Sequence, residues 1–285
     1  MPLPAAPLPS RLPASAASDG HEWACSPADF GRIQSLIHKR AGISLHDGKL
    51  SMVYGRVSRR LRATGHRSFK SYLDWLEQHE GAEWQAFINV LTTNLTGFFR
   101  EQHHFTALAD VLATRRTHAW RIWCCAASTG EEPYSIAMTA SETLGPGSSF
   151  RIVCSDIDTE VLSTAQRAIY SIDAGKGLSA QRLQRFFMRG TGGNAGLMRV
   201  KPEMQKNMEF RTINLIEEPL FTEPFDLVFC RNVMIYFDAA TKRQVLARIH
   251  RVLKPGGLLF VGHAESFGQA RDLFVLRGKT IYERI

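Results

Sequence analysis

The 285-residue sequence lacks the features that mark several large classes of protein. No apolar run approaches the roughly 20 residues that a membrane span needs, and no basic segment leads into an apolar one at the N-terminus. We therefore expect a cytoplasmic protein with no signal peptide and no direct membrane insertion. The five cysteines lack metal-ligand spacing and four of them end apolar runs, so we predict buried free thiols, no structural disulfide and no metal site.

Acidic residues are nearly absent from residues 31 to 70, which hold ten Lys and Arg against the single acid Asp47. The formal net charge of +8 indicates an acidic partner, and nucleic acid, an anionic membrane or an acidic protein would all qualify. A predicted helix from Leu50 to Gly65 carries four arginines away from its apolar stripe. This basic ridge consists of Arg56, Arg59, Arg60 and Arg62. It is either a solvated helix face or a docking surface for an acidic partner. In the second case, reversing Arg56 and Arg60 to Glu should weaken association without lowering the melting temperature.

Composition divides the chain into three parts. Residues 1–24 hold five of the twelve prolines and predict a disordered Pro/Ala-rich tail. Residues 25–92 predict a small basic helical domain, because apolar residues recur there at helical spacing. Residues 93–285 alternate strand and helix patterns, except at about 173–208, where six glycines and an alternating segment predict a small antiparallel β insertion.

The segment 93–101 joins these two domains and has no clean periodicity. It is either a linker with Phe98 and Phe99 in the core, or a functional loop, since polar connecting segments frequently carry function. It leads to a predicted helix around Phe105 to Thr114, on whose surface we expect His103 and His104.

The stretch R-I-W-C-C-A-A-S-T-G-E-E-P-Y-S-I-A at 121–137 predicts a buried strand, a tight turn and a helix. Gly130 is free to take positive φ, so another molecule could approach the backbone closely. The spacing G-x-G-x-x-G is missing, and Glu131 and Glu132 stand where a pyrophosphate would need uncompensated N–H groups. The turn therefore suits a nucleoside with hydroxyls or a cationic group better than a dinucleotide.

Asp156 follows the next predicted strand, about one βαβ unit after Gly130. A carboxylate there is the usual partner of a ribose diol, because two acceptor oxygens match two hydroxyl donors. Asp158 is expected to cap the following helix. The repeated β-α-β units close with a hairpin, which favours the seven-stranded, Rossmann-like α/β sheet of class I methyltransferases over a parallel dehydrogenase sheet.

Five motifs occur in an order that resembles the chemotaxis receptor glutamate O-methyltransferases of the CheR type. They are T-N-L-T-G-F-F-R-E at 93–101, A-S-T-G-E-E-P-Y-S at 127–135, S-D-I-D at 155–158, F-C-R-N-V-M-I-Y-F at 229–237 and L-K-P-G-G at 253–257. The resemblance covers about residues 26–285 and leaves the tail unmatched. A lone K-P-G-G is weak, but the full ordered set is specific.

The resemblance implies binding of S-adenosylmethionine, with S-adenosylhomocysteine as product, by residues at matching motif positions. These are Asn94, Thr96, Arg100, Glu131, Asp156, Asn214, Leu215, Arg231 and Asn232. It also implies methyl transfer to glutamate side chains of chemoreceptors for adaptation in bacterial chemotaxis. Arg100 and Arg231 could each neutralise a carboxylate of cofactor or substrate. Tyr236 is the candidate for lining the methyl path, unless it is an ordinary core tyrosine, and Arg100 the candidate for orienting the acceptor.

For partners, the resemblance implies that the arginine ridge meets the acidic cytoplasmic helical bundle of a transmembrane chemoreceptor, and that the enzyme is a monomer. The segment F-M-R-G-T-G-G-N-A-G at 187–196 is similar to the insertion of members that also bind a receptor's C-terminal pentapeptide. Gly190 and Gly192 are the expected docking positions.

Two other readings compete with this one. A nucleic-acid methyltransferase fits the net charge, but residues 231–234 do not form the N/D-P-P-Y/F motif of amino methylation and no cysteine stands in a P-C pair. A non-catalytic adaptor could bind the cofactor as a structural or sensory ligand. Only the receptor methyltransferase would yield base-labile methyl esters on protein.

Overall fold

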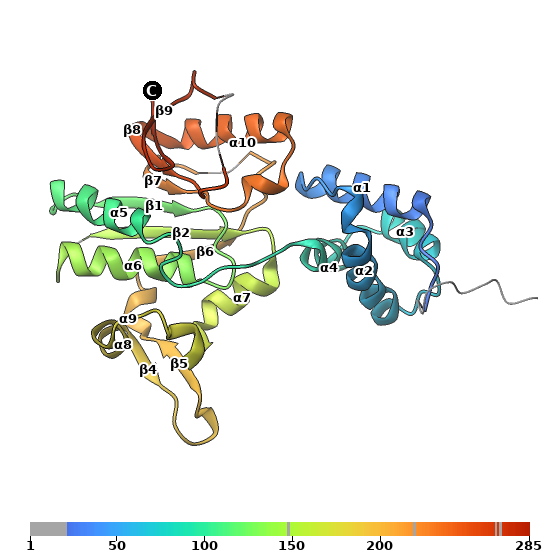
Figure 1. Cartoon of the computed structure of the whole chain (residues 1–285), viewed down its shortest axis with the longest axis horizontal. Helices are drawn as coiled ribbons and strands as arrows, with labels where there is room; N and C mark the ends of the chain where they lie inside the picture. Colours follow the sequence, from blue (N-terminus) through green and yellow to red (C-terminus); the bar gives the residue numbers. More distant parts are fainter. Residues whose placement is uncertain (1–21, 147–148, 219–220, 266, 268–269) are drawn as a thin grey trace, which may run out of the picture.

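The computed structural model describes residues 22–146, 149–218, 221–265, 267 and 270–285. A helical domain lies beside a larger α/β domain, from which a small sheet projects (Figure 1). The predicted disordered tail lies outside the described residues except for its last three. None of the described helices combines the length and the hydropathy needed to traverse a lipid bilayer.

The predicted helical domain contains four α-helices. They are α1 (Pro27–Ala41), α2 (Leu50–Thr64), α3 (Phe69–Gln78) and α4 (Ala82–Leu91), with a short 3-10 turn η1 (Asp47–Lys49) before α2. Ser26 and Asp29 form a capping box at the start of α1, and Gly42 and Gly65 end α1 and α2 in the left-handed conformation. The apolar stripes meet in a core of their own.

The main sheet has seven strands in the order β6-β2-β1-β7-β8-β10-β9. Five are parallel: β1 (Trp120–Cys124), β2 (Phe150–Asp156), β6 (Met208–Thr212), β7 (Phe225–Phe229) and β8 (Leu253–Phe260). The closing hairpin is antiparallel and consists of β9 (Phe274–Gly278) and β10 (Ile281–Arg284). This arrangement confirms the predicted class I methyltransferase sheet.

Helices cover both faces of the sheet. Figure 1 shows α6 (Glu131–Leu144) and α10 (Ala239–Val252) on opposite sides of it. α5 (His103–Thr114) and α6 contribute to one apolar cluster and α10 to the other. α7 (Thr159–Arg167) follows β2. Because both faces are covered, the central strands are apolar almost throughout, as their sequences predicted.

The insertion is a three-stranded antiparallel sheet in the order β3-β5-β4, formed by β3 (Ile169–Ser171), β4 (Phe187–Arg189) and β5 (Leu197–Val200). Its short helices are η2 (Ile172–Gly175), α8 (Ala180–Phe186), η3 (Gly192–Asn194) and α9 (Pro202–Gln205). The sheet begins before the expected boundary at residue 173. Ala168 ends α7 in the left-handed conformation and the chain turns into β3 at once.

Candidate active site

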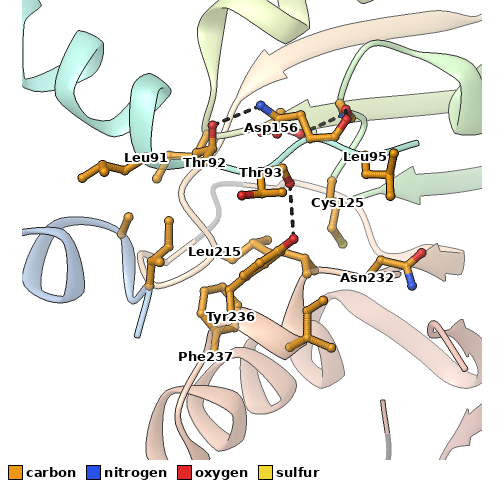
Figure 2. A pocket seen from close by; sticks show the side chains of 18 of the residues that line it. Leu91, Thr92, Thr93, Leu95, Cys125, Asp156, Leu215, Asn232, Tyr236 and Phe237 are labelled. Atoms are coloured by element: carbon orange, nitrogen blue, oxygen red, sulfur yellow. Dashed lines mark hydrogen bonds between the residues drawn. The ribbon is translucent and has the colours of Figure 1, made fainter. Parts of the chain in front are cut away.

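A cavity of about 440 Å³ lies where the helical domain meets the carboxyl ends of the parallel strands. This volume is in the usual range for a small-molecule site. Figure 2 shows side chains from both domains pointing into it. It is lined by most of the residues singled out by sequence: Asn94, Thr96, Arg100, Asp156, Asn214, Leu215, Arg231, Asn232 and Tyr236. The fold thus brings together motifs that are up to 142 residues apart.

Asp156 ends β2 and is only 8% exposed. Its carboxylate accepts hydrogen bonds from the backbone N–H groups of Ser128 (2.8 Å) and Asp158 (3.0 Å), which hold it at the cavity wall. Burial raises the pKa of Asp156 to about 6, because the charged form loses hydration that these bonds only partly replace. Its neighbour Asp158 caps α7 with bonds from the N–H groups of Glu160 and Val161, as predicted.

Gly130 has φ +103°, as its place in the turn predicted, but the close approach comes from this chain itself. A Cβ atom there would lie 2.6 Å from Tyr170 Oη and 3.0 Å from Ala165 Cα. The Tyr170 hydroxyl donates to Thr129 O at 2.8 Å. The glycine therefore lets α7 and β3 pack against the turn, and close approach of another molecule to its backbone stays a prediction.

The two glutamates at the start of α6 have different surroundings. Glu131 is not among the cavity-lining residues, and its carboxylate accepts a bond from the Thr129 hydroxyl at 2.6 Å. Glu132 lines the cavity floor, is 8% exposed and pairs with Arg231 at 2.6 Å. The role of Glu131 as a cofactor ligand stays a prediction, while Glu132 was not chosen from sequence.

Arg231 has a fully buried guanidinium that is engaged within the protein. Besides its pair with Glu132, it donates to the backbone oxygen of Arg100 at 2.6 Å. This differs from the sequence expectation that Arg231 neutralises a carboxylate of cofactor or substrate. Arg100 also lines the cavity and donates to Leu95 O at 2.7 Å, without an acidic partner among the described residues. Arg100 is therefore the better candidate for a ligand carboxylate.

The segment 93–101 packs its aromatic residues against the core, as a linker would, and lines the cavity with polar residues, as a functional loop would. Phe98 and Phe99 pack against the core, and the Phe99 N–H donates to Ser135 Oγ at 2.9 Å. Thr93, Asn94 and Thr96 line the cavity, and the Asn94 amide donates to Oδ2 of the buried Asp158 at 2.7 Å. The aromatic pair thus anchors a loop whose polar side is presented to the cavity.

The loop after β7 presents Asn232 and Tyr236 to the cavity. Asn232 has φ +57°, and η4 (Met234–Tyr236) follows. Tyr236 is half-buried and points toward Thr93, to whose backbone oxygen its hydroxyl donates at 3.4 Å (Figure 2). Tyr236 lines the cavity and also packs against the core of the helical domain, so its role at the methyl path stays a prediction. Asn214 donates to Arg40 O at 2.8 Å and ties the cavity to the helical domain.

Glu265 was missed in the sequence. It is 5% exposed and accepts bonds from the N–H groups of Asn232 (2.9 Å), Met234 (2.7 Å) and Gly262 (2.6 Å), so it holds the loop after β7 in place. An acidic residue three positions after the apolar segment 258–262 was the available signal, since it stands at the same sheet edge as the other site residues.

His104 is completely buried, so the expectation of a surface position is wrong. Burial lowers its pKa to about 3, and its Nδ1 lies 3.6 Å from Glu101 Oε2. Glu101, His103 and His104 have ligand atoms close enough to hold a metal ion. However, Arg231 Nη2 lies 3.4 Å from the same Glu101 oxygen and would repel a second cation. We assign no metal site here.

Both halves of the chain match models of one family. The model described as "CheR methyltransferase, SAM binding domain" matches residues 94–282, and "CheR methyltransferase, all-alpha domain" matches residues 28–92. The chain belongs to the CheR methyltransferase family. Its α/β domain with the cavity is therefore the S-adenosylmethionine-binding domain, and the chain is a methyltransferase.

Relatives from several bacteria agree with this assignment. The chain is 54% identical over 264 residues to a chemotaxis protein methyltransferase of Escherichia coli K12, with 91% of each protein covered. It is 46% identical over 258 residues to chemotaxis protein methyltransferase 2 of Pseudomonas aeruginosa, with 89% of this chain and 92% of the relative covered. The family supports the predicted chemotaxis methyltransferase over a nucleic-acid enzyme or an adaptor.

In this CheR methyltransferase the arginine ridge is largely engaged in internal contacts. Arg60 binds Glu83 through two nitrogens at 2.6 and 2.9 Å, and Arg62 pairs with Glu22 at 2.6 Å. Arg56 donates to Thr92 O at 2.5 Å. Arg59 is exposed and has no partner among the described residues. Reversing Arg60 would place two carboxylates together, so the expectation of an unchanged melting temperature is wrong for that position.

The insertion of the CheR chain presents β4 as an edge strand, followed by the two glycines expected from sequence. A Cβ at Gly190 would lie 2.1 Å from Asn194 O, so only glycine fits this turn. Gly192 has φ +57° with open space around it. The turn geometry accounts for both glycines without a bound peptide, and their docking role stays a prediction.

Proposed function

We propose that this CheR methyltransferase transfers the methyl group of S-adenosylmethionine to glutamate carboxylates of a chemoreceptor's cytoplasmic helical bundle. The products are glutamyl methyl esters and S-adenosylhomocysteine, and the enzyme acts in the cytoplasm. The observation that carries the proposal is the cavity itself. It has a buried carboxylate at the end of β2, and its mouth adjoins a basic face of the helical domain.

The cavity lining fits the cofactor. Asp156 supplies acceptor oxygens for a ribose diol, and apolar side chains such as Leu91, Ile157 and Leu215 suit a planar base. Arg100 suits the cofactor's carboxylate. We assign further polar contacts to Asn94, Thr96, Asn214, Asn232 and, at the start of α6, Glu131.

The bound cofactor supplies an electrophilic methyl group on a positively charged sulfur. A glutamate with an unperturbed pKa near ~4.3 is already ionised at neutral pH, so no general base is needed. The chain's own residues bind, orient and exclude water, and positioning of two opposite charges accounts for most of the rate. Tyr236 presents its ring at the cavity wall, where cation–π attraction can contribute about 0.5–2 kcal/mol.

The acceptor helix is proposed to lie along α2. Lys49 and Met52 line the cavity, and Arg56 and Arg59 continue the same helical face at spacings of four and three. This stripe leads from the cavity mouth across the helical domain. An acidic helix on it would place one carboxylate at the mouth and others beside Arg56 and Arg59. Arg60 and Arg62 then stabilise the helical domain through their pairs with Glu83 and Glu22, and we assign them no contact with the acceptor helix.

A receptor's C-terminal peptide is proposed to pair with the exposed edge of β4. An edge strand offers unpaired backbone groups, and tethering there would raise the local concentration of acceptor without new contacts in the cavity. Isothermal titration with the receptor's terminal pentapeptide tests this step. Absence of heat together with absence of competition would refute the tether and leave the transfer reaction intact.

Incubation with methyl-labelled S-adenosylmethionine and chemoreceptor-containing membranes of Escherichia coli K12 tests the reaction. We expect label on the receptor that base releases as volatile methanol, because a glutamyl methyl ester hydrolyses and an N-methyl group does not. Base-stable label on nucleic acid, or cofactor binding without transfer, would refute the proposal.

A further inference from the structure

Two large apolar side chains are exposed at the mouth of the cavity. Leu95 is 78% exposed and Ile235 is 47% exposed, and both line the cavity. An exposed leucine taken alone needs no explanation. These two come from different segments and line the same cavity, so a molecule that enters it meets exposed apolar side chains.

Both residues stand on segments that are held in place. The carbonyl of Leu95 accepts from the Arg100 guanidinium at 2.7 Å. Ile235 lies in η4 between Met234, which is fully buried, and Tyr236, whose hydroxyl is bonded to Thr93 O. Glu265 accepts from the Met234 N–H at 2.7 Å. Leu95 and Ile235 are therefore exposed on segments whose backbone is held by hydrogen bonds. We call these two segments the rim of the cavity.

The cavity mouth is basic on the side of the helical domain. Lys49 is exposed and lines the cavity, and Arg59 lies further along the same face of α2. A partner that covers the rim must therefore offer apolar side chains near the cavity and acidic ones beyond it. An amphipathic helix with apolar residues beside the acceptor glutamate and acidic residues further along has this chemistry.

We propose that Leu95 and Ile235 form an apolar clamp that grips the residues flanking the acceptor glutamate. The clamp rests on the function proposed above and extends it, because it assigns a specificity determinant to the reaction. Acceptors with apolar neighbours are favoured, since these neighbours bury the two side chains. Acceptors with charged neighbours are disfavoured, because a charge would lose hydration against the clamp without gaining a partner.

The test uses the full chain with the variants Leu95→Ser, Ile235→Ser and the double variant. Escherichia coli K12 membranes supply the receptor, and labelled S-adenosylmethionine supplies the methyl group. We expect each single variant to raise the KM for receptor about tenfold, because each loses most of the apolar burial of one side chain. The dissociation constant for S-adenosylhomocysteine and the melting temperature should not change, since both side chains are exposed.

Leu276→Ser is the matched control. Leu276 is 56% exposed on β9 and does not line the cavity, so its loss should leave the KM for receptor unchanged. An unchanged KM in the Leu95 and Ile235 variants would overturn the clamp while wild-type transfer still supports the proposed function. An equal change in cofactor affinity would also overturn it, because the side chains would then contact the cofactor. Failure of the wild-type chain to form methyl esters would refute the proposed function itself.

Discussion

The pair of Glu132 and Arg231 shows why a charged residue can belong to a site without touching the ligand. The Arg231 side chain is fully buried, and its guanidinium binds both Glu132 and the backbone oxygen of Arg100. It therefore connects the start of α6 to the loop of Arg100, the residue proposed to bind the carboxylate of the cofactor. Removing Glu132 takes away the nearest counter-charge of this buried guanidinium and leaves only the Glu101 carboxylate, 3.4 Å away.

We therefore expect Glu132→Gln to lower the free energy of unfolding by about 3–5 kcal/mol in urea titrations. The control is Glu142→Gln, which breaks a pair with Arg182 whose side chains are 27% and 28% exposed. This pair is better solvated, so its loss should cost less than about 1 kcal/mol. Equal losses for the two variants would contradict the structural role of the buried pair.

The proposed contact of Asp156 with the ribose predicts that cofactor affinity depends on pH. The pKa of Asp156 is about 6, so its carboxylate is ionised at pH 7 and mostly protonated at pH 5. We expect the dissociation constant for S-adenosylhomocysteine to rise about tenfold between these values. The effect on stability has the opposite sign. Because the pKa is raised in the folded state, the contribution of Asp156 to stability is greatest at low pH and is lost as pH rises through 6.

The variant Asp156→Asn distinguishes the titration of Asp156 from the titration of other groups in the protein. It should bind the product more weakly at pH 7, with little change in affinity between pH 7 and 5, because the amide does not ionise. Isothermal titration at both pH values measures this. A wild-type affinity that is flat across this range, or an Asn variant with full affinity at pH 7, would show that Asp156 does not hold the cofactor.

At the scale of elements, α2 carries two neighbouring arginines with different surroundings. Arg60 is bound to Glu83 by two nitrogens, whereas Arg59 is exposed. We expect Arg59→Glu to weaken receptor association in a salt-dependent way and to leave the melting temperature unchanged. Arg60→Glu should lower the melting temperature by several degrees, because it places a carboxylate beside Glu83. Differential scanning calorimetry and receptor co-sedimentation measure the two effects. A reversed order of melting temperatures would contradict the assignment.

The turn after β4 offers a similar matched pair. A Cβ at Gly190 would lie 2.1 Å from Asn194 O, whereas nothing lies within 4 Å of a Cβ at Gly193. We expect Gly190→Ala to distort the turn and to abolish pentapeptide binding in isothermal titrations, and Gly193→Ala to bind as the wild type does. If peptide binding is retained in Gly190→Ala, the peptide does not use this edge.

At the scale of the whole molecule, the two domains build the cavity together. Ala41 and Met52 line it from the helical domain, and Asn214 binds Arg40 O across the boundary. Gln85 donates to Ile157 O at 2.7 Å and Thr92 to Asp158 Oδ2 at 2.6 Å. A ligand in this cavity touches both domains and should couple their unfolding.

We therefore expect one calorimetric transition that S-adenosylhomocysteine shifts upward. At a hundred times its dissociation constant, the ligand should add about 2.7 kcal/mol to the free energy of unfolding. Two separate transitions, of which only the later one responds to ligand, would mean that the helical domain does not contribute to the site.

The strands, the helices and the cavity motifs could be predicted from the sequence, because hydrophobic periodicity and turn residues act locally. Polar residues at the ends of successive parallel strands must meet at one edge of a sheet, so Asp156, Asn214 and Asn232 could be grouped without a structure. The burial of His104 could not be predicted in this way. It depends on how α5 packs against the sheet, and on Thr280, whose hydroxyl is hydrogen-bonded to the His104 ring from 176 residues further along the chain.

What the sequence determined by itself was the order of elements and the kind of chemistry at their ends. Only the tertiary structure decided which charged side chains remain available to bind a ligand or a partner. It turned Arg231 and Arg60 inward to Glu132 and Glu83, left Arg100 and Arg59 without acidic partners among the described residues, and brought Glu265 under the Asn232 loop. The physical reason is that a charge is neutralised by its neighbours in space, and those neighbours come from distant parts of the chain.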